Sequence, residues 1–416
     1  MIQMLVLISL FLIPAYIFRF SIVGIPTNVF EIAVLVTFIY FVVSWIRNNR
    51  QFPQKYQKLK FGSIFAYLLL LASFISIFVA DDRTRALGIF KGWFLVPIVL
   101  YFIIINTFDR AKIKYLSIPL YFSLITISFW AVLQKLGVIS TLFYQVEDLG
   151  FADYLARFRA FGPFESPNYL AMFVVPMIFL SLPILELVRR RTDQILILTT
   201  FIFPLYALYA SHSLGGLLAI GFATVSFLAF RLAKEGKIQT QEEKRKLLTT
   251  ILGLIIVAVI FSIIFSSISQ ETYSRNIRME IYRYAGQLIT THPILGIGPG
   301  EFQQAVESIS KSNAGFQLYG LSYALHPHNV YLAFWLNLGI AGLLFFLILL
   351  IYFFVKIGRS AGGVFLTSAL CAAMLAILVH GIVDTTYFKN DLSAIFWLIL
   401  AQSLIVGAKN GQPSSQ

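Results

Sequence analysis

The sequence predicts an all-α membrane protein: a polytopic bundle of about twelve transmembrane helices with one large, partly helical loop outside the membrane. Of its 416 residues, 58% are hydrophobic and only 12% are charged, whereas a soluble domain has about 25% charged residues. The apolar residues gather in runs of about 17 to 25, the length that a helix needs to cross a hydrocarbon core of about 30 Å. The basic residues lie mostly in short segments between these runs. The net charge of +13 therefore indicates membrane topology, and no nucleic-acid partner is expected.

The apolar runs place the expected helices in order along the chain. They lie approximately at residues 2–19, 29–46, 61–80, 88–106, 115–136, 166–187, 195–210, 213–230, 248–268, 328–354, 362–383 and 392–408. The first run has no basic residue before it and no small-residue cleavage pattern after it, so we interpret it as an uncleaved span. The single cysteine, Cys371, excludes an intramolecular disulfide. We expect one membrane domain over residues 1–408 and a short cytoplasmic tail at 409–416.

Basic residues also predict which helix ends face the cytoplasm. Five of them lie in or next to the loop 47–60, and placing this loop in the cytoplasm puts both chain termini there. The same choice puts 20 of the 32 basic residues on the cytoplasmic side, in agreement with the positive-inside rule. Arg19, after the first run, argues against this orientation, but it is one charge against five.

Two segments on the opposite, outer side are long enough to hold structure. Residues 137–165 form a moderate loop, and residues 269–327 form a loop of nearly 60 residues, a length that usually has a function. Within the larger loop, apolar residues recur at helical spacing: Ile277, Ile281, Tyr284 and Leu288. This pattern predicts an amphipathic helix on the outer interface.

The strongest local motif is His326-Pro327-His328-Asn329, between the large loop and the tenth run. Proline is favoured in the first turn of a helix, so we expect the motif at a helix N-terminus, where free N–H groups and the dipole attract phosphate. The same positive end keeps an imidazole neutral, as a general base requires. Two alternatives remain, a histidine pair that only caps the helix and a metal site. No cysteine or acidic cluster nearby in the sequence completes a coordination shell, so no metal is expected.

From His328 onward the sequence resembles the signature of bacterial O-antigen ligases. That signature is His followed by Asn, Ser or Gln and, after nine further residues, Gly-x-x-Gly-Thr. Here HN at 328–329 is followed after nine residues by GIAG at 339–342. The wider family includes O-antigen polymerases and related transferases of lipid-linked glycans. Leu343 stands where ligases have Thr, which leaves room for a polymerase-like relative.

Two more outer segments resemble this family. Residues 291–302, THPILGIGPGEF, are similar to a glycine-rich segment before the catalytic histidine, and residues 159–168, RAFGPFESPN, are similar to the entry to a span. By themselves the glycines are either a phosphate cradle or a structural turn. Arg159 and Arg278 match family arginines. Two guanidinium groups suit a diphosphate because each pairs with phosphate oxygens in a bidentate way, although a surface arginine also pairs with lipid phosphate.

The sequence departs from the family at Leu214, where many relatives have arginine in a Ser-Arg-Gly segment. Lys91, at the start of the fourth run, is a candidate replacement for that cation; the alternative is that it only extends to the membrane interface beside Trp93. Residues 380–391, HGIVDTTYFKND, are similar to the last outer loop of the family. Asp384 in this loop is a candidate to orient His328 or an acceptor hydroxyl, unless the loop is only a solvated network.

The resemblance implies an enzyme of the bacterial inner membrane with an extracytoplasmic active site. It would move a glycan from an undecaprenyl-diphosphate carrier to a hydroxyl of a glycan or glycolipid acceptor such as lipid A-core, without a metal or another cofactor. His328 is the expected catalytic base, and His326 and Asn329 orient it or bind substrate. Membrane lipid surrounds the spans.

Other functions remain open at this point. A ligase and a polymerase differ only in the acceptor. A transporter or lipid flippase also has about twelve spans, but it would place ionisable residues near the bilayer midplane. The middles of the predicted spans are almost free of charge, which favours the transferase.

Overall fold

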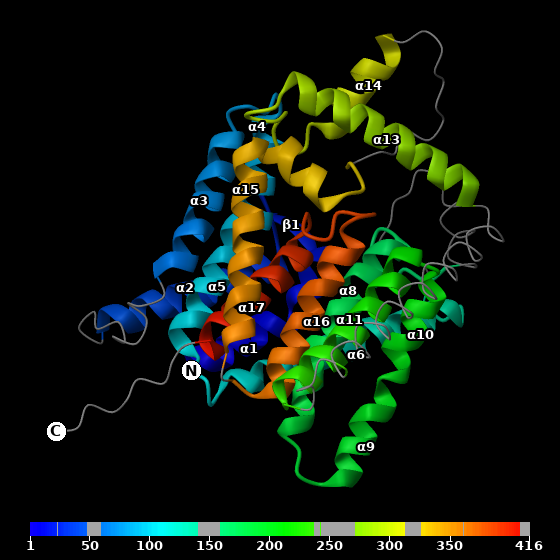
Figure 1. Cartoon of the computed structure of the whole chain (residues 1–416). Coiled ribbons are helices and arrows are strands. Elements are labelled where there is room, and N and C mark those ends of the chain that lie inside the picture. Colours follow the sequence, from blue (N-terminus) through cyan, green and yellow to red (C-terminus); the bar gives the residue numbers. More distant parts are fainter. Residues whose placement is uncertain are drawn as a thin grey trace.

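Helices make up most of the chain (Figure 1). The computed structural model describes residues 1–22, 24–47, 60–139, 159–236, 242, 271–312, 326–360 and 362–407. Within these ranges, β-structure is limited to one two-stranded hairpin. The predicted class is therefore confirmed as mostly helical, with the hairpin as an addition that the apolar runs did not indicate.

The elements before residue 140 follow one another in chain order. They are α1 (Ile2–Phe11), the 3-10 helix η1 (Ile13–Ile17), β1 (Arg19–Ile22), β2 (Ile25–Asn28), α2 (Val29–Arg47), α3 (Lys60–Ser76), α4 (Arg83–Ile89), the π-helix η3 (Phe90–Leu95), α5 (Val96–Thr107), η4 (Ile113–Leu116) and α6 (Ser117–Lys135).

The elements after residue 158 complete the bundle. They are α8 (Pro167–Ser181), η5 (Leu182–Glu186), α9 (Arg191–Thr200), α10 (Ile202–Ser211), α11 (Leu214–Lys234), α13 (Glu271–Thr291), α14 (Phe302–Ser312), α15 (Val330–Arg359), α16 (Val364–His380) and α17 (Asn390–Val406).

Seven of the described helical stretches are long and apolar enough to cross a membrane. They are Val29–Arg47, Arg83–Thr107, Ile113–Lys135, Pro167–Glu186, Arg191–Ser211, Leu214–Lys234 and Val330–Arg359. Shorter apolar helices accompany them at Ile2–Phe11, Ser63–Ser76, Val364–His380 and Asn390–Val406. All of these stretches fall on predicted runs, whereas the predicted run 248–268 lies outside the described residues. The chain is therefore a membrane protein, and the total of about twelve spans stays a prediction.

The first predicted span, residues 2–19, is wrong in its second half. α1 ends at Phe11, and the chain then passes through η1 into the hairpin of β1 and β2, which pair antiparallel. Pro14 lies in the first turn of η1, and it cannot continue the α-helical hydrogen bonding. Gly24 supplies the positive φ of 77° in the hairpin turn, which glycine adopts without strain. Hydropathy did not show where the helix ends because residues 12–18 are also apolar. The exposed hairpin side chains Phe20, Ile22 and Ile25 are apolar as well.

The most buried helices position the site. α17 is buried along nearly its whole length, and so is α8. α8 packs against α16, and both contact α17. The start of α8 meets the segment between α16 and α17, because Asn168 donates to Asp384 across a separation of 216 residues. The best-packed part of the bundle thus brings three chain segments together at one end.

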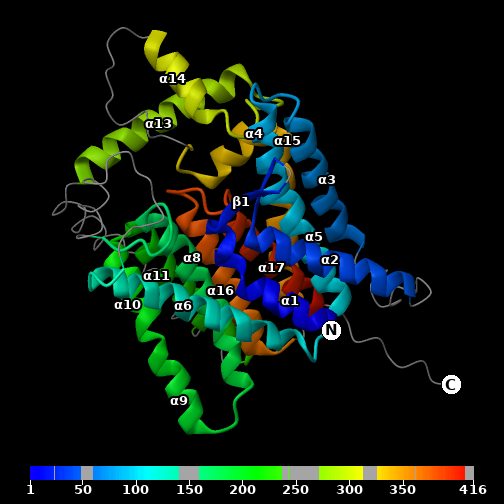
Figure 2. The ribbon, with the colours of Figure 1, turned by 180° about the vertical axis from the view of Figure 1, so that it is seen from behind.

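α13 and α14 lie across that end of the bundle (Figures 1 and 2). Three buried residues of α13, Ile281, Tyr284 and Leu288, pack against α14 and against Leu336 of α15. The predicted amphipathic helix is confirmed, although its apolar face contacts protein. The side chain of Ile277 lies outside the described residues.

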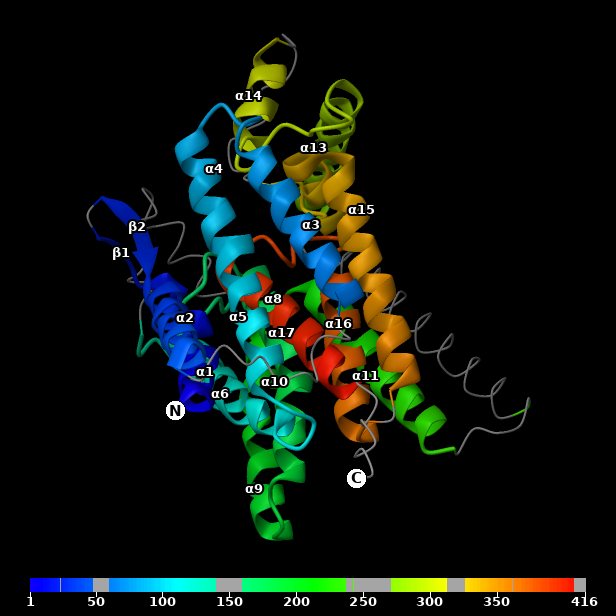
Figure 3. The same cartoon turned by 90° about the vertical axis from the view of Figure 1, so that its left-hand side faces the viewer.

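Basic residues assigned to the cytoplasm lie at the opposite end, as far as the structure describes them. Lys234, at the end of α11, donates to the carbonyls of Gly358 and Ser360 at 2.8 and 2.7 Å. α9 extends beyond the bundle at this same end, far from α13 (Figure 3). The orientation of the bundle in the membrane stays a prediction.

Candidate functional site

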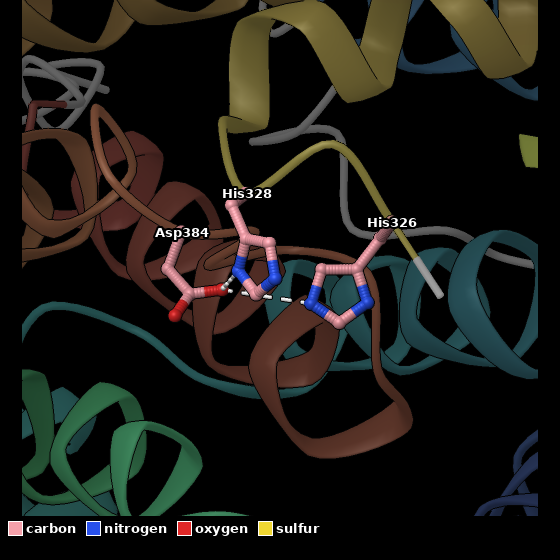
Figure 4. A group of neighbouring side chains, drawn as sticks. All are labelled: His326, His328 and Asp384. Atoms are coloured by element: carbon pink, nitrogen blue, oxygen red, sulfur yellow. Dashed lines mark hydrogen bonds and ion pairs between the residues drawn. The ribbon is translucent and has the colours of Figure 1, made fainter. Parts of the chain in front are cut away.

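Two histidines and one aspartate meet at the end of the bundle that α13 covers (Figure 4). His328 Nδ1 lies 3.3 Å from Asp384 Oδ1, and His326 Nε2 lies 3.6 Å from the same oxygen. The two imidazole centroids are 4.7 Å apart. The histidine side chains are 22% and 25% exposed, against 3% for Asp384. The cluster therefore has a buried acid at its base and two accessible imidazoles.

Several bonds hold Asp384 in the segment between α16 and α17. Its N–H donates to the His380 carbonyl at 3.0 Å, its Oδ1 accepts the Thr385 N–H at 2.9 Å, and its Oδ2 accepts from Asn168 at 3.1 Å. Burial alone would raise the pKa of this carboxyl, but interactions with His328 and then His326 hold the pKa well below its usual range. Asp384 is therefore a carboxylate within hydrogen-bond reach of His328 and within ion-pair range of His326.

His328 has a positive φ of 45°, which residues other than glycine adopt infrequently. Its carbonyl accepts the Tyr282 hydroxyl of α13 at 3.0 Å, and the next residue, Asn329, donates to the Ile382 carbonyl at 2.9 Å. Strained backbone of this kind persists where surrounding contacts define it. Contacts from α13 and from the segment after α16 thus fix the imidazole that faces Asp384.

α15 begins at Val330, later than the motif predicted. Asn329 is the N-cap, and its side-chain oxygen accepts the N–H groups of Tyr331 and Leu332 at 3.0 Å each. The Val330 N–H donates to the Gly381 carbonyl at 2.8 Å. These N–H groups are already bonded inside the protein, so this terminus does not offer them to an anion. Asn329 therefore has a structural role, and its part in substrate binding stays a prediction.

His326 lies on the other side of the cluster. Its ring centroid is 6.1 Å from that of Tyr169 on α8. Burial lowers the pKa of His326, and the hydrogen bond to Asp384 offsets this only in part. His326 is therefore neutral near neutral pH.

Arg159 reaches the cluster through Asn168. Its Nη2 donates to Asn168 Oδ1 at 3.3 Å, and Asn168 in turn donates to Asp384. The guanidinium also donates to the carbonyls of Ser211 and His212 at 2.8 and 3.3 Å. Sequence reasoning quoted Asn168 only as part of a motif and did not identify it as a site residue. Its place directly after Pro167, at the start of a span, was the available signal.

Arg278 approaches from α13, one helical turn before Tyr282. Burial raises the pKa of the Tyr282 hydroxyl, and the charge of Arg278 opposes this rise. Because that hydroxyl contacts the His328 backbone, Arg278 lies near the cluster on a different element from Arg159. Their joint contact with a diphosphate stays a prediction.

A second charged group lies beside His326. Lys389, just before α17, is paired with Glu165, which also pairs with Arg19 at 3.4 Å. The Lys389 ammonium is 4.9 Å from the centroid of the Tyr169 ring, in cation–π range. Burial would raise the pKa of Glu165, but Lys389 and Arg19 together lower it. Glu165 thus pairs with two cations.

Lys91 lies in a separate ion pair. Its ammonium is 2.8 Å from Glu31 Oε2 and also donates to the Pro26 carbonyl. Glu31 accepts from Asn390 at 3.1 Å, next to Lys389 in the chain. Among the described residues, these contacts of Lys91 do not lead to the two histidines. Its predicted role in place of the arginine missing at Leu214 therefore stays a prediction.

The region of Leu214 packs against His380. A Cβ at Gly215 would lie 2.7 Å from the His380 ring, so glycine is required for this approach. His380 is buried, and its Nδ1 has no partner among the described residues. It was not predicted as a site residue, because only the fold brings α11 to the end of α16.

The glycine-rich segment at 291–302 holds the chain after α13 against the backbone of α15. A Cβ at Gly296 would lie 2.3 Å from the Leu336 carbonyl oxygen, and one at Gly339 would lie 1.9 Å from the Ile294 carbonyl oxygen. Both glycines have a φ of 69°, and Gly339 breaks the helical geometry inside α15. Two backbones meet here without side chains between them. The structure favours the structural turn over the phosphate cradle.

Residues 199–347 match a family model described as O-antigen ligase. The match spans 149 of the 416 residues. The match contains α13, the glycine-rich segment, the motif at 326–329 and the kink in α15, so the resemblance inferred from the sequence is confirmed. No curated protein matches the chain.

The O-antigen ligase segment supplies only part of the site. Both histidines and Arg278 lie within it, while Arg159, Asn168 and Asp384 lie outside. The match supports a membrane protein with a ligase- or polymerase-type function on glycans. The fold adds the buried acid and the bonds that hold it.

Proposed function

We propose that the protein is an inverting glycosyltransferase that moves a glycan from an undecaprenyl-diphosphate carrier to a hydroxyl of a glycan or glycolipid acceptor. The observation that carries this proposal is the 3.3 Å contact between His328 Nδ1 and Asp384 Oδ1. His328 lies within the segment that matches the O-antigen ligase family model. The reaction takes place on the extracytoplasmic face of the inner membrane, and no metal or nucleotide takes part.

His328 is the general base. Asp384 is a carboxylate and accepts a hydrogen bond from Nδ1–H of the imidazole, which leaves the lone pair on Nε2. Nε2 takes the proton of the acceptor hydroxyl as the acceptor oxygen attacks the anomeric carbon. Asp384 then stabilises the imidazolium that forms, as an orienting carboxylate does in a hydrolase triad. The proton leaves to solvent after the transfer.

The leaving group needs positive charge and no protonation. The bond between the anomeric carbon and the diphosphate oxygen breaks, and its electron pair stays on the diphosphate. Arg159 and Arg278 stabilise that charge from two elements, since a guanidinium is permanently charged and binds phosphate in a bidentate way. Attack opposite the leaving group inverts the anomeric centre.

The other candidates have supporting roles. His326, neutral and beside the base, contacts the acceptor or the donor sugar. Lys91 pairs with Glu31 on the side of α2 and η3, so any contact that it makes with substrate contributes less than those of the two arginines. The apolar surface of the spans holds the polyprenyl tail. Asn329 keeps His328 at the start of α15.

The first experiment identifies the acceptor. Purified full-length protein is incubated with a polyprenyl-diphosphate glycan and either lipid A-core or a second donor glycan. Product with lipid A-core alone identifies a ligase, and product with the second donor alone identifies a polymerase. Absence of product with both acceptors contradicts the transferase proposal.

The second experiment tests the base. His328→Ala should lower turnover by about 10²- to 10⁴-fold, the range of general-base contributions. His292→Ala is the matched control, because His292 is exposed and contacts only Thr291 through its side chain in the described structure. Wild-type turnover in His328→Ala would show that another group takes the proton.

A further inference from the structure

The geometry points to a Zn²⁺ site formed by His326 Nε2, His328 Nδ1 and Asp384 Oδ1, whose occupation blocks glycan transfer. The three residues are a group whose ligand atoms all lie within 4.8 Å of one another. Imidazole nitrogen and carboxylate oxygen are both Zn²⁺ ligands, and three protein ligands with one open position are common for this ion.

Two of the three separations between the ligand atoms fit a tetrahedral ion. Zn²⁺ binds nitrogen and oxygen at about 2.0 to 2.2 Å, so two ligand atoms of a tetrahedron lie about 3.3 to 3.6 Å apart. Asp384 Oδ1 lies 3.3 Å from the His328 nitrogen and 3.6 Å from the His326 nitrogen. Both imidazoles are already directed at one carboxylate oxygen (Figure 4). The two imidazole nitrogens lie within 4.8 Å of each other, and side-chain rotation would bring them to the tetrahedral separation.

The surroundings also suit a metal. Asn168 donates to Oδ2 of Asp384 and leaves Oδ1 on the side of the histidines, which is how outer residues orient a metal ligand. The Tyr282 hydroxyl fixes the His328 backbone. The histidines retain 22% and 25% exposure, so an ion can enter from the outer side and keep a water as its fourth ligand.

The sequence argument against a metal depended on the missing third ligand. Asp384 lies 56 residues after His328, so no spacing pattern around the motif at 326–329 indicated it. The fold supplies this acid from the segment between α16 and α17. The reason for excluding a metal site from the sequence therefore does not hold in three dimensions.

Zn²⁺ on Nδ1 changes the tautomer of His328. The single N–H proton of the neutral imidazole moves from Nδ1 to Nε2, where the lone pair of the base was. His326 changes in the opposite direction, from a proton on Nε2 to one on Nδ1. This blocking effect depends on the proposed role of His328 as base, whereas binding of the ion does not.

Binding is measured on purified full-length protein in detergent, freed of metal with a chelator that is then removed. Calorimetric titration should show one Zn²⁺ per chain. His326→Gln should weaken binding by more than about 100-fold and Asn168→Ala by about 10- to 100-fold, the range for outer residues. His292→Ala should bind like wild type. Absence of saturable binding, or wild-type affinity in His326→Gln, overturns the site.

A spectrum of the wild-type protein does not depend on the folding of any variant. Co²⁺ in place of Zn²⁺ should give visible absorption bands of a four-coordinate ion, and added Zn²⁺ should remove them. Mg²⁺ should not, because it prefers six oxygen ligands. Bands of an octahedral ion would contradict the proposed geometry.

Transfer assays test the block. Zn²⁺ should inhibit wild-type transfer at the concentration that half-saturates the calorimetric site, and EDTA should restore activity. Bound Zn²⁺ without inhibition, or with stimulation, overturns the block. Zn²⁺ binding by a protein that transfers no glycan to either acceptor leaves the metal site standing and removes the proposed function, so the two failures are distinguishable.

Discussion

Two charged regions at the same end of the bundle differ in how their charges are matched. Around Lys91, the ammonium pairs with Glu31, whose side chain is 8% exposed. Around His328, a single carboxylate serves two imidazoles, and the carboxylate is the buried member. A cation and an anion that pair one to one neutralise each other's charge. A carboxylate shared by two titratable rings can respond to a proton or an ion, which makes this region the reactive one.

Replacement of Asp384, the acid shared by the two histidines, should lower turnover more than any other change that tests this comparison. Asp384→Asn keeps the size of the side chain but removes its charge, so the imidazolium of His328 is no longer stabilised. We expect turnover to fall by about 10²- to 10⁴-fold, within the range for acid–base groups and their orienting carboxylates. The measurement is kcat on purified protein, with a thermal unfolding scan as the folding control. Turnover close to wild type would reduce Asp384 to a packing residue.

Arginine-to-lysine changes should have an intermediate effect. Arg278→Lys keeps the positive charge and loses the bidentate fork, so kcat/KM should fall by about tenfold, equivalent to about 1.4 kcal/mol. Arg159→Lys should lower kcat/KM further, because the Arg159 guanidinium also donates to Asn168 and to the Ser211 carbonyl. Steady-state kinetics on both variants checks this order. Equal kinetics for Arg278→Lys and wild type would indicate general attraction rather than a fitted contact.

Breaking the matched pair should have the smallest effect on catalysis. Lys91→Met leaves Glu31 largely buried without its cation, and we expect a loss of about 1 to 3 kcal/mol in stability. The double variant Lys91→Met/Glu31→Gln should recover most of the lost stability. Thermal unfolding of both variants tests the pair. A large rise in KM with unchanged stability would instead support Lys91 as a substrate contact and would remove the contrast between the two regions.

The membrane architecture was predictable because hydropathy reports directly on long apolar helices. It failed at the end of α1, because the apolar run 2–19 continues past Phe11 through Pro14 and the η1 segment. The motif at 326–329 identified the two histidines. Their shared acid was named only through the family resemblance, since the contact between Asp384 and His328 joins segments 56 residues apart.

Asn168 and His380 show what local patterns leave out. Each becomes significant through a neighbour that lies far away in the chain, Asp384 for Asn168 and Gly215 for His380. No periodicity encodes such pairs, because they arise from how buried helices pack. The anion site expected at the start of α15 failed for a related reason, as Asn329 and Gly381 already accept the free N–H groups there.

The kink at Gly339 fixes the rotation of the motif at 326–329 about the axis of α15. Gly339 is anchored to the Ile294 carbonyl, and nine residues of helix separate it from Asn329. One residue more or fewer in this interval would rotate the motif by about 100° and shift it by about 1.5 Å. His328 would then face away from Asp384 although every residue of the site was present. The fixed interval between His328 and Gly339 therefore determines the direction in which the imidazole points about the axis of α15.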